Sequence, residues 1–386
     1  MSNSVKRRMA PAPSALLPCP LDSKMKVLIF ANELDNHVTP IRWALQQAGY
    51  DVHCWCGLAW TAPEQAWLLL REEPRMALGS HLLEPGDSVW LRQPDQPDFG
   101  PGSGDHPTPP SSHYTSFFAS VASMIEMQPV RCINPYPASR LVRHKAVQLH
   151  FARASGLRIP ATLISNSPQP VRTFFETGRR IVCKPFVSHF WEQSTGGTAV
   201  AGTFELSRDQ LPEDEVFTFA PAIYQQLIAK SFDVRTVIMG ESIYSFALHT
   251  PGRVLDWRPQ AALKKLCVEP IATPAVVEEG ILAFAQKTGV CFGSIDFAVD
   301  ASGEWWFLEI NEQGQFLWLD QFHPAARLQQ KFCAFLTAPD SSGEGLEARE
   351  HLFPSIHDYE RSPEKQKADE LLAAVVAESR YITRES

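Results

Sequence analysis

The stretch of residues 291–315, CFGSIDFAVDASGEWWFLEINEQGQ, constrains the fold of this chain more than any other. Two largely apolar runs flank residues 300–303, whose sequence DASG is typical of a hairpin turn. Pairing of residue 299 with residue 304 places Asp296 opposite Phe307 and diagonal to Glu309. Strict alternation then puts every second residue of each strand on one face: Ser294, Asp296 and Ala298 on the first strand, and Trp305, Phe307, Glu309 and Asn311 on the second.

We therefore expect Asp296, Glu309 and Asn311 to converge on one surface of the hairpin, and all three carry oxygen ligands. Such a group suits Mg²⁺, which binds one or two carboxylates and completes its octahedron with substrate phosphates. The alternative is a solvated sheet face that bears polar side chains. An unpaired carboxylate would be costly in so apolar a strand, which favours the metal site.

Lys145 lies in a helix that we predict over residues 138–155. A lysine on the apolar face of a helix either extends its ammonium group to solvent or faces a ligand, and the helix alone leaves both open. At about 100° per residue, Lys145 falls inside a stripe made by the apolar residues Leu141, Val142, Ala146, Leu149 and Ala152.

A second lysine, Lys184, ends a β-branched strand directly before Pro185. The segment that follows, residues 188–202, contains Gly196 and Gly197, whose backbone N–H groups can surround phosphate oxygens. The alternatives are an ordinary lysine at a strand end and an ordinary Gly-Gly turn.

Residues 222–240 supply a further set of candidate groups. Residues 225–228, QQLI, are expected to form an edge-like strand that offers backbone and amide groups to a base. Asp233 and Arg235 share one face of the next strand, where a carboxylate suits a ribose and an arginine suits a developing oxyanion. A surface ion pair across the sheet is the alternative.

The 386 residues are enough for two or three domains. A strand at 26–32, a helix at 41–49 and a strand at 51–56 form a β-α-β opening, so we expect a small α/β domain over residues 25–130. Residues 32–35, NELD, stand where a dinucleotide site would need glycines, so the sequence gives no support for a Rossmann site there. Residues 131–340 mix helices and hairpins and predict an α+β domain. A charged tail with a possible helix follows at 341–386.

Composition narrows the classes of partner and the compartment. With 35 Lys and Arg against 43 Asp and Glu, the net charge of −8 excludes a general nucleic-acid binder, and no apolar run is long enough for a membrane span. Eight scattered cysteines predict free thiols and a cytoplasmic protein. Residues 1–24 imitate a secretory signal, but four prolines interrupt them, so we expect a disordered leader.

The order of these parts resembles the ATP-grasp fold of carboxylate-amine ligases: a helix lysine, a strand Lys-Pro, a glycine-rich loop, a Gln-Gln hinge, and then Asp followed by Glu-x-Asn. The finer resemblance is to the ATP-grasp ribosomal peptide maturases that make graspetides of the microviridin type. It spans residues 131–336, and its most specific segments are 135–166, 254–258 (VLDWR) and 307–320 (FLEINEQGQFLWLD). The fold class that it implies is α+β, an ATP-grasp fold preceded by the small α/β domain.

The resemblance also implies a role for each matching residue. It assigns the ATP phosphates to Lys145 and Lys184 under the loop of Gly196 and Gly197, the adenine to Gln226 and the backbone of Ile228, and the ribose to Asp233. It assigns two Mg²⁺ ions to Asp296, Glu309 and Asn311, the acyl phosphate to Arg235, and the border of the acceptor peptide to Asp256 and Arg258. Gln226 stands where the family commonly has Glu, and its amide oxygen can still accept the adenine amino hydrogen.

The activity implied is an ATP- and Mg²⁺-dependent ligase that activates a side-chain carboxylate of a ribosomal precursor peptide and joins it to a hydroxyl or an amine. One alternative is a RimK-like ligase that adds an amino acid to a peptide or protein terminus. Another is a nucleotide-binding module without turnover, which has little use for the full metal set together with Arg235. The sequence leaves a homodimer open.

Overall fold

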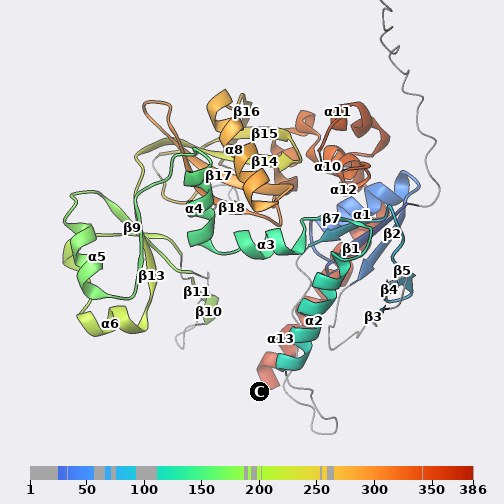
Figure 1. The fold of residues 1–386 in the computed structure, drawn as a ribbon, viewed down its shortest axis with the longest axis horizontal. Coiled ribbons are helices and arrows are strands. Elements are labelled where there is room, and N and C mark those ends of the chain that lie inside the picture. Colours follow the sequence, from blue (N-terminus) through green and yellow to red (C-terminus); the bar gives the residue numbers. More distant parts are fainter. Residues whose placement is uncertain are drawn as a thin grey trace, which may run out of the picture.

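The computed structural model describes residues 25–32, 34–55, 66–70, 75–92, 111–186, 190–192, 198–200, 202–252, 254–258, 265–340 and 342–385. The expected leader at 1–24 lies outside the described residues, as do Gly196 and Gly197. Three larger sheets follow one another along the chain, with helices packed between and around them (Figure 1).

The first sheet is parallel, with strand order β2-β1-β6-β7. Apolar strands such as KVLIF at β1 are buried on both faces, as expected of a covered parallel sheet. The expected β-α-β opening is confirmed, and a small antiparallel sheet, β3-β4-β5, lies beside it. The elements are β1 (Lys26–Phe30), α1 (Val38–Gln47), β2 (Asp51–Trp55), β3 (Ala66–Leu69), β4 (Arg75–Leu78), β5 (His81–Leu82), β6 (Ser88–Leu91), α2 (Ser111–Ile125) and β7 (Arg131–Ile133).

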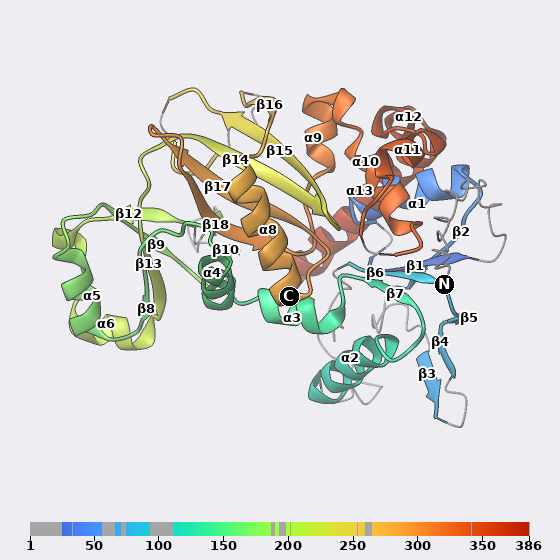
Figure 2. The ribbon, with the colours of Figure 1, turned by 45° about the horizontal axis from the view of Figure 1, so that its top comes forward.

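The second sheet is antiparallel, with order β12-β9-β13-β8, and it forms a separate lobe with two helices on one face (Figures 1 and 2). The expectation of an edge-like strand at residues 225–228 is wrong, because β13 lies between β9 and β8 and ends at Gln226. The elements are β8 (Thr162–Ser165), α5 (Pro168–Phe175), β9 (Ile181–Lys184), β12 (Phe204–Leu206), the 3₁₀ turn Arg208–Gln210, α6 (Asp214–Phe219) and β13 (Ala222–Gln226); β10 (Phe190–Glu192) pairs with β11 (Thr198–Val200).

The third sheet is antiparallel, with order β16-β15-β14-β17-β18. Helices α4 and α8 cover one face of it, and their apolar residues share a core with β17 and β18 (Figure 2). The elements are α3 (Tyr136–Val142), α4 (Lys145–Ala154), β14 (Lys230–Met239), β15 (Ser242–His249), β16 (Cys267–Ile271), α8 (Ala275–Thr288), β17 (Phe292–Asp300) and β18 (Trp305–Asn311).

The predicted hairpin is present as β17 and β18, but its register differs from the prediction. Val299 pairs with Trp305 rather than with residue 304, and a β-bulge at Leu308 shifts the pairing so that Asp296 lies directly opposite Glu309. The bulge also breaks the alternation, because Phe307 packs in the core under α8 while Glu309 faces the opposite side. Trp305 and Phe307 therefore do not share a face with Glu309, as had been expected.

The helix predicted at 138–155 is two helices. His144 has an extended backbone with φ −89 and ψ 116, so α3 ends before it and Lys145 begins α4. The Val142 carbonyl, which loses its helical partner at the break, accepts a 2.7 Å hydrogen bond from the Gln148 side chain. Lys145 is thus the first residue of α4, and the apolar stripe predicted for one continuous helix is interrupted at His144.

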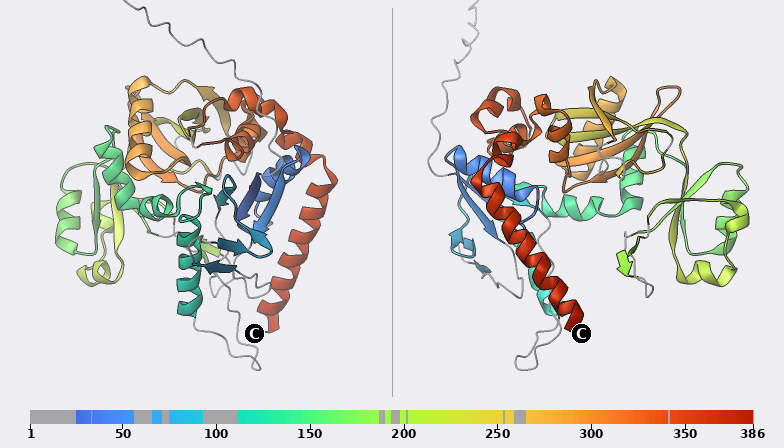
Figure 3. Two further views of the ribbon diagram at one scale, coloured as in Figure 1. Left: turned by 45° about the vertical axis from the view of Figure 1, so that its right-hand side comes forward. Right: turned by 180° about the vertical axis from the view of Figure 1, so that it is seen from behind.

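The C-terminal helices return to the first sheet. Residues 346–360 pack their apolar side chains against α1 and α10 in the largest hydrophobic cluster, which joins residues from Val27 to Tyr359 (Figure 3). The elements are α9 (Leu317–Phe322), the 3₁₀ turn Pro324–Ala326, α10 (Leu328–Leu336), α11 (Leu346–Arg349), the 3₁₀ turn Glu350–Leu352, α12 (Ile356–Glu360) and α13 (Pro363–Glu385). Within the described residues, no helix is both long and apolar enough to span a bilayer.

Candidate functional site

A cavity of about 330 Å³, called the site cavity below, lies between the second and third sheets. Strands β9 and β13 line one side of it, and strands β14, β17 and β18 line the other. Most of the residues singled out from the sequence meet in its lining: Lys145, Lys184, Gln226, Ile228, Asp233, Asp256, Arg258, Asp296 and Glu309. Arg235 and Asn311 are not among the lining residues; Arg235 bonds the lining residue Asp296, and Asn311 lies two positions after Glu309 on β18.

The two carboxylates of the hairpin lie among cations. The Glu309 Oε1 atom is 3.3 Å from Arg258 Nη2, and its Oε2 atom is 3.6 Å from Lys145 Nζ. Asp296 Oδ1 accepts a 2.8 Å hydrogen bond from buried Arg235, while its Oδ2 atom lies 3.9 Å from Arg258. Three of these four contacts are too long to be strong hydrogen bonds, so the carboxylate oxygens keep acceptor capacity.

Charge in the site is balanced between groups of opposite sign. Burial on its own raises the pKa of Glu309, but the charges of the surrounding lysines and arginines together outweigh it and hold the pKa below its usual range; these are Lys145, Lys184, Arg258 and Arg235. Burial lowers the pKa of Lys184, and the Glu309 carboxylate opposes that shift. The site therefore keeps an ionised carboxylate beside two lysines, which is the electrostatic setting that phosphate and metal ions require.

The residues present fit a hard divalent cation. Asn311 Oδ1 accepts a 3.0 Å hydrogen bond from the Gln313 N–H and retains a second lone pair. Ser294 Oγ, on the strand β17 that also carries Asp296, is buried without a hydrogen-bond partner among the described residues. In the same part of the chain, no three Asp, Glu, His or Cys side chains form a ready-made metal cluster. A site of two carboxylates and one amide agrees with Mg²⁺, which leaves positions to phosphates and water.

Gln225 takes part in the site through Lys184, whereas the sequence prediction assigned a specific role only to Gln226. Its Oε1 atom accepts a 2.7 Å hydrogen bond from Lys184 Nζ, and its Nε2 donates to Thr162 at 3.0 Å. The side chain of Gln226 turns the other way, with Oε1 3.4 Å from the Ala161 N–H. Alternation along β13 allows only one of two adjacent glutamines to reach Lys184, which was the available signal.

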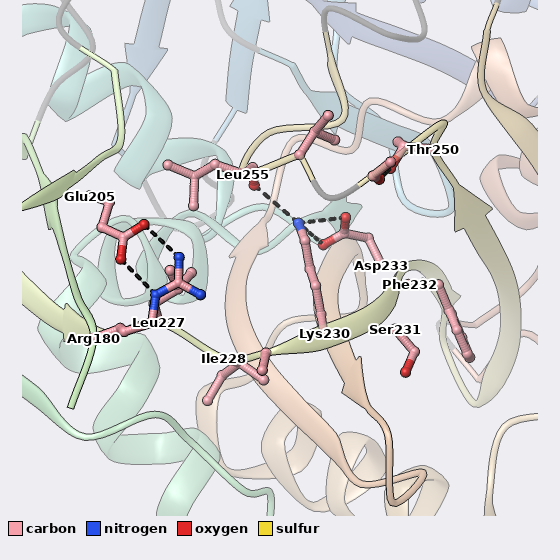
Figure 4. A pocket seen from close by; sticks show the side chains of 13 residues that line it. Arg180, Glu205, Leu227, Ile228, Lys230, Ser231, Phe232, Asp233, Thr250 and Leu255 are labelled. Atoms are coloured by element: carbon pink, nitrogen blue, oxygen red, sulfur yellow. Dashed lines mark hydrogen bonds and ion pairs between the residues drawn. The ribbon is translucent and has the colours of Figure 1, made fainter.

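Asp233, which lines the site cavity, forms an ion pair with Lys230. Lys230, which the sequence prediction also missed, donates to both Asp233 oxygens at 2.9 and 2.7 Å and to the Leu255 carbonyl at 3.0 Å (Figure 4). Burial raises the pKa of Asp233 to about 6 even with this lysine beside it. A smaller cavity of about 170 Å³ adjoins here and reaches the ion pair between Arg180 and Glu205 (Figure 4).

Residues 256–258 bring a charged pair and an aromatic ring to the mouth of the site. Arg258 forms an ion pair with Asp256 at 3.2 Å and another with Glu309 at 3.3 Å. Arg258 therefore links Asp256 to the carboxylate of Glu309. Trp257 stacks on Trp318, with ring centroids 5.0 Å apart. This stack ties the segment to α9, which begins six residues after Asn311.

No family model matches the chain, and no curated protein matches it in sequence. Solved structures do match. A RiPP-associated ATP-grasp ligase of Chryseobacterium gregarium, in complex with ADP and a leader and core peptide, superposes with a TM-score of 0.70 at 22% identity, over 81% of this chain and 96% of the other. The macrocyclase MdnC of Microcystis aeruginosa MRC, bound with precursor peptide MdnA, gives 0.67 at 23% identity, over 81% and 98%.

The ATP-grasp ligase PsnB, complexed with a phosphomimetic variant of a minimal precursor, Mg and ADP, gives a TM-score of 0.61 at 19% identity, over 84% of this chain and 98% of the other. All three cover almost the whole of the other chain. The predicted fold class is confirmed: the chain has the fold of ATP-grasp ligases, with the α/β unit in front of the grasp.

Proposed function

We propose that this chain is an ATP-dependent ligase that activates a side-chain carboxylate of a ribosomal precursor peptide and joins it to a hydroxyl or amine of that peptide. The observation that supports this most is the site cavity, where lysines and arginines surround two carboxylates that keep free acceptor capacity. The solved ligases with this fold are described with ADP, Mg and precursor peptides, which supports the same activity here.

The reaction needs two group transfers. A carboxylate oxygen of the peptide attacks the γ-phosphorus of ATP, which releases ADP and forms an acyl phosphate. A hydroxyl or amine then attacks the acyl carbon, the C–O bond to phosphate breaks, and the nucleophile loses its proton. Phosphoryl transfer depends mainly on positioning and on electrostatic stabilisation, and the cations of the site cavity can provide both.

Each cation has a place in this scheme. Lys145 and Lys184 hold the phosphates of ATP, and Gln225 keeps the Lys184 ammonium group directed into the cavity. Arg235, fixed by Asp296, stabilises the acyl phosphate, and Arg258 with Asp256 borders the peptide. Asp233 and Lys230 meet the ribose, while Gln226 and the backbone of Ile228 meet the adenine; Gly196 and Gly197 cover the phosphates.

Asp296, Glu309 and Asn311 would hold Mg²⁺, with two ions as the proposed count. When bound, Mg²⁺ neutralises phosphate charge and acts as a Lewis acid toward the transferred group. The protein's own contribution is to keep the Glu309 carboxylate ionised, through the cations that lower its pKa, and to hold Asp296 in place through Arg235.

The test uses a short peptide encoded beside this chain and rich in Asp, Glu, Thr, Ser or Lys near its C-terminus. Incubation with enzyme, ATP and Mg²⁺ is expected to lower the peptide mass by one water per bond and to release one phosphate per bond. Tandem mass spectra should lose fragments between the joined side chains.

A mass gain of one residue, seen only with added free amino acid, would contradict this proposal and indicate a RimK-like ligase instead. Binding of ATP without any change in peptide mass or phosphate would indicate a nucleotide-binding module. The stacked tryptophans Trp257 and Trp318 favour the peptide, because they form an apolar wall where a free amino acid would need a tighter polar pocket.

The proposed compartment is the cytoplasm. Every cysteine that the structure describes is a free thiol, which supports a reducing environment. Homodimer formation remains part of the proposal, to be measured by light scattering, and neither nucleic acid nor a membrane is expected as a partner.

A further inference from the structure

Ligands of open parallel sheets bind at the carboxyl ends of the strands, at the point where the strand order reverses. In the first sheet that point lies between β1 and β6, because the chain runs from β1 to β2 on one side and from β6 to β7 on the other. Four polar residues follow these strand ends: Asp35 and His37 after β1, Arg92 after β6 and Asn134 after β7. We call this group the socket.

A segment of the chain itself fills the socket. Asn134 Nδ2 donates to the Glu312 carbonyl at 2.6 Å, and Arg92 Nη1 donates to the carbonyls of Gln313 and Gly314 at 2.6 Å each. His37 Nε2 accepts the Phe316 N–H at 3.1 Å. The crevice where a ligand would be expected is therefore taken by residues 312–316.

The socket residues are fixed in turn by one another and by the first sheet. Arg92 is 3% exposed, and its Nη2 donates to Asp35 Oδ2 at 3.2 Å. Asp35 Oδ1 accepts the N–H groups of His37 and Val38 at the start of α1. Burial, and then the charge of Arg92, lower the pKa of His37 to about 3, so the imidazole stays neutral and can accept.

The held segment continues directly into the proposed metal site. It begins one residue after Asn311, whose side chain accepts the Gln313 N–H. The Gln315 carbonyl, in the same segment, accepts a 2.9 Å hydrogen bond from Arg235, the residue that also bonds Asp296. A displacement of residues 313–316 would therefore move a proposed metal ligand and the proposed acyl-phosphate arginine together.

We propose that the socket positions residues 312–316, and through them Asn311 and Arg235, for binding of Mg²⁺ and phosphate. Arg92 and His37 are then positioning residues that act from the first sheet on the site of the third. This inference rests on the proposed function, since it concerns how that site is held in place.

The test compares His37→Leu with His37→Gln, whose amide oxygen can replace the imidazole as acceptor for the Phe316 N–H. Calorimetry with a non-hydrolysable ATP analogue is expected to show that His37→Leu needs about tenfold more Mg²⁺ for half-maximal binding, the cost of one hydrogen bond. Binding measured in excess chelator should not change. His37→Gln should restore most of the Mg²⁺ dependence.

Val89→Ala is the matched control, because it removes a buried side chain of β6 without removing a socket hydrogen bond. It should lower thermal stability and leave the Mg²⁺ dependence unchanged. If Val89→Ala and His37→Leu shift the Mg²⁺ dependence equally, the socket is merely structural and the proposal is overturned.

A measurement on the wild-type protein decides the question if His37→Leu does not fold. Hydrogen exchange of the peptide that covers residues 312–318 should be slow in the free protein and should change little when Mg²⁺ and the ATP analogue are added. Fast exchange that slows only with ligand would overturn the proposal. Failure of the wild-type protein to bind the analogue at all would instead contradict the proposed function.

Discussion

The socket of the first sheet and the site cavity between the second and third sheets both gather arginine and carboxylate side chains. In the socket, the carbonyls of Gln313 and Gly314 receive hydrogen bonds of 2.6 Å from Arg92. In the site cavity, the corresponding contacts of Glu309 are 3.3 and 3.6 Å long. The socket is filled by residues 312–316 of the chain itself, whereas the site cavity has an open volume of about 330 Å³.

The difference teaches how to separate a structural polar cluster from a ligand site. Buried polar groups are normally satisfied, because an unpaired donor or acceptor costs free energy. Where the chain supplies partners at short distance, as it does for both Nη atoms of Arg92, those groups require no ligand. Where charges face each other at long distance around a void, as around Glu309, a ligand completes the set.

Of the changes considered, Glu309→Ala in the site cavity should have the largest effect, because it should abolish nearly all turnover. Loss of the carboxylate proposed to hold Mg²⁺ leaves the phosphate charge uncompensated, and turnover should fall by about 10³-fold or more. Phosphate release measures it, and a melting curve close to wild type shows that the fold is kept. Glu304→Ala, at the exposed turn of the same hairpin, is the control. Wild-type turnover at all Mg²⁺ concentrations would remove Glu309 from the metal site.

Lys184→Ala should weaken binding of a non-hydrolysable ATP analogue by roughly 10- to 150-fold, the value of one charged hydrogen bond. Lys145→Ala should act in the same direction. Calorimetry measures both, with the exposed residue Lys287 changed to Ala as the control. Equal affinity in Lys184→Ala would leave Lys184 as an ordinary lysine at the end of a strand.

Gly314→Ala should disturb the segment 312–316 that fills the socket and lower the free energy of unfolding measured by urea titration. Gly314 has φ +63, and an added Cβ atom would clash with the Phe292 ring. Strain at such a position costs about 1–3 kcal/mol, and the ring cannot give way cheaply inside the core. Gly303→Ala, at a glycine with φ +82 but open space around it, should lower the free energy of unfolding by less in the same urea titration. Equal losses would show that segment 312–316 is not tightly enclosed.

The smallest expected effect is a change in nucleotide affinity with pH, which tests the role of Asp233 in the site cavity. Burial raises the pKa of Asp233 to about 6, so the carboxylate is ionised at pH 7.5 and mostly protonated at pH 5.5. If the ionised form accepts the ribose hydroxyls, affinity should fall roughly fourfold over this interval. Asp233→Asn should remove that step, and a step that persists in this variant must come from another group.

The hairpin was predictable because period-two alternation reports local structure. Asp296 and Glu309 do face each other, but they do so through a bulge at Leu308 that strict alternation cannot show. The break between α3 and α4 was not predicted for a related reason. The Gln148 side chain stabilises the break by donating a hydrogen bond to the Val142 carbonyl, and helix propensities of neighbouring residues do not predict such a bond.

The site residues that sequence reasoning missed depend on contacts between distant parts of the chain. Arg92 meets Gln313 across 221 positions, and His37 meets Phe316 across 279. No spacing rule connects such pairs. Gln225 is different, since alternation along its strand allowed a choice between two glutamines, and the family pattern pointed to the neighbour, Gln226.

The shared core of the two ends of the chain has a consequence for synthesis. Trp43 of α1 packs on Tyr359, and Tyr50 stacks on Phe353, with ring centroids 5.6 and 5.9 Å apart. A ribosome that adds about 5–20 residues per second needs roughly 15–60 s to travel from one side of these contacts to the other. During that time the face of α1 that packs on these residues is uncovered, so the core around α1 is completed only after residues 353–359 have been made.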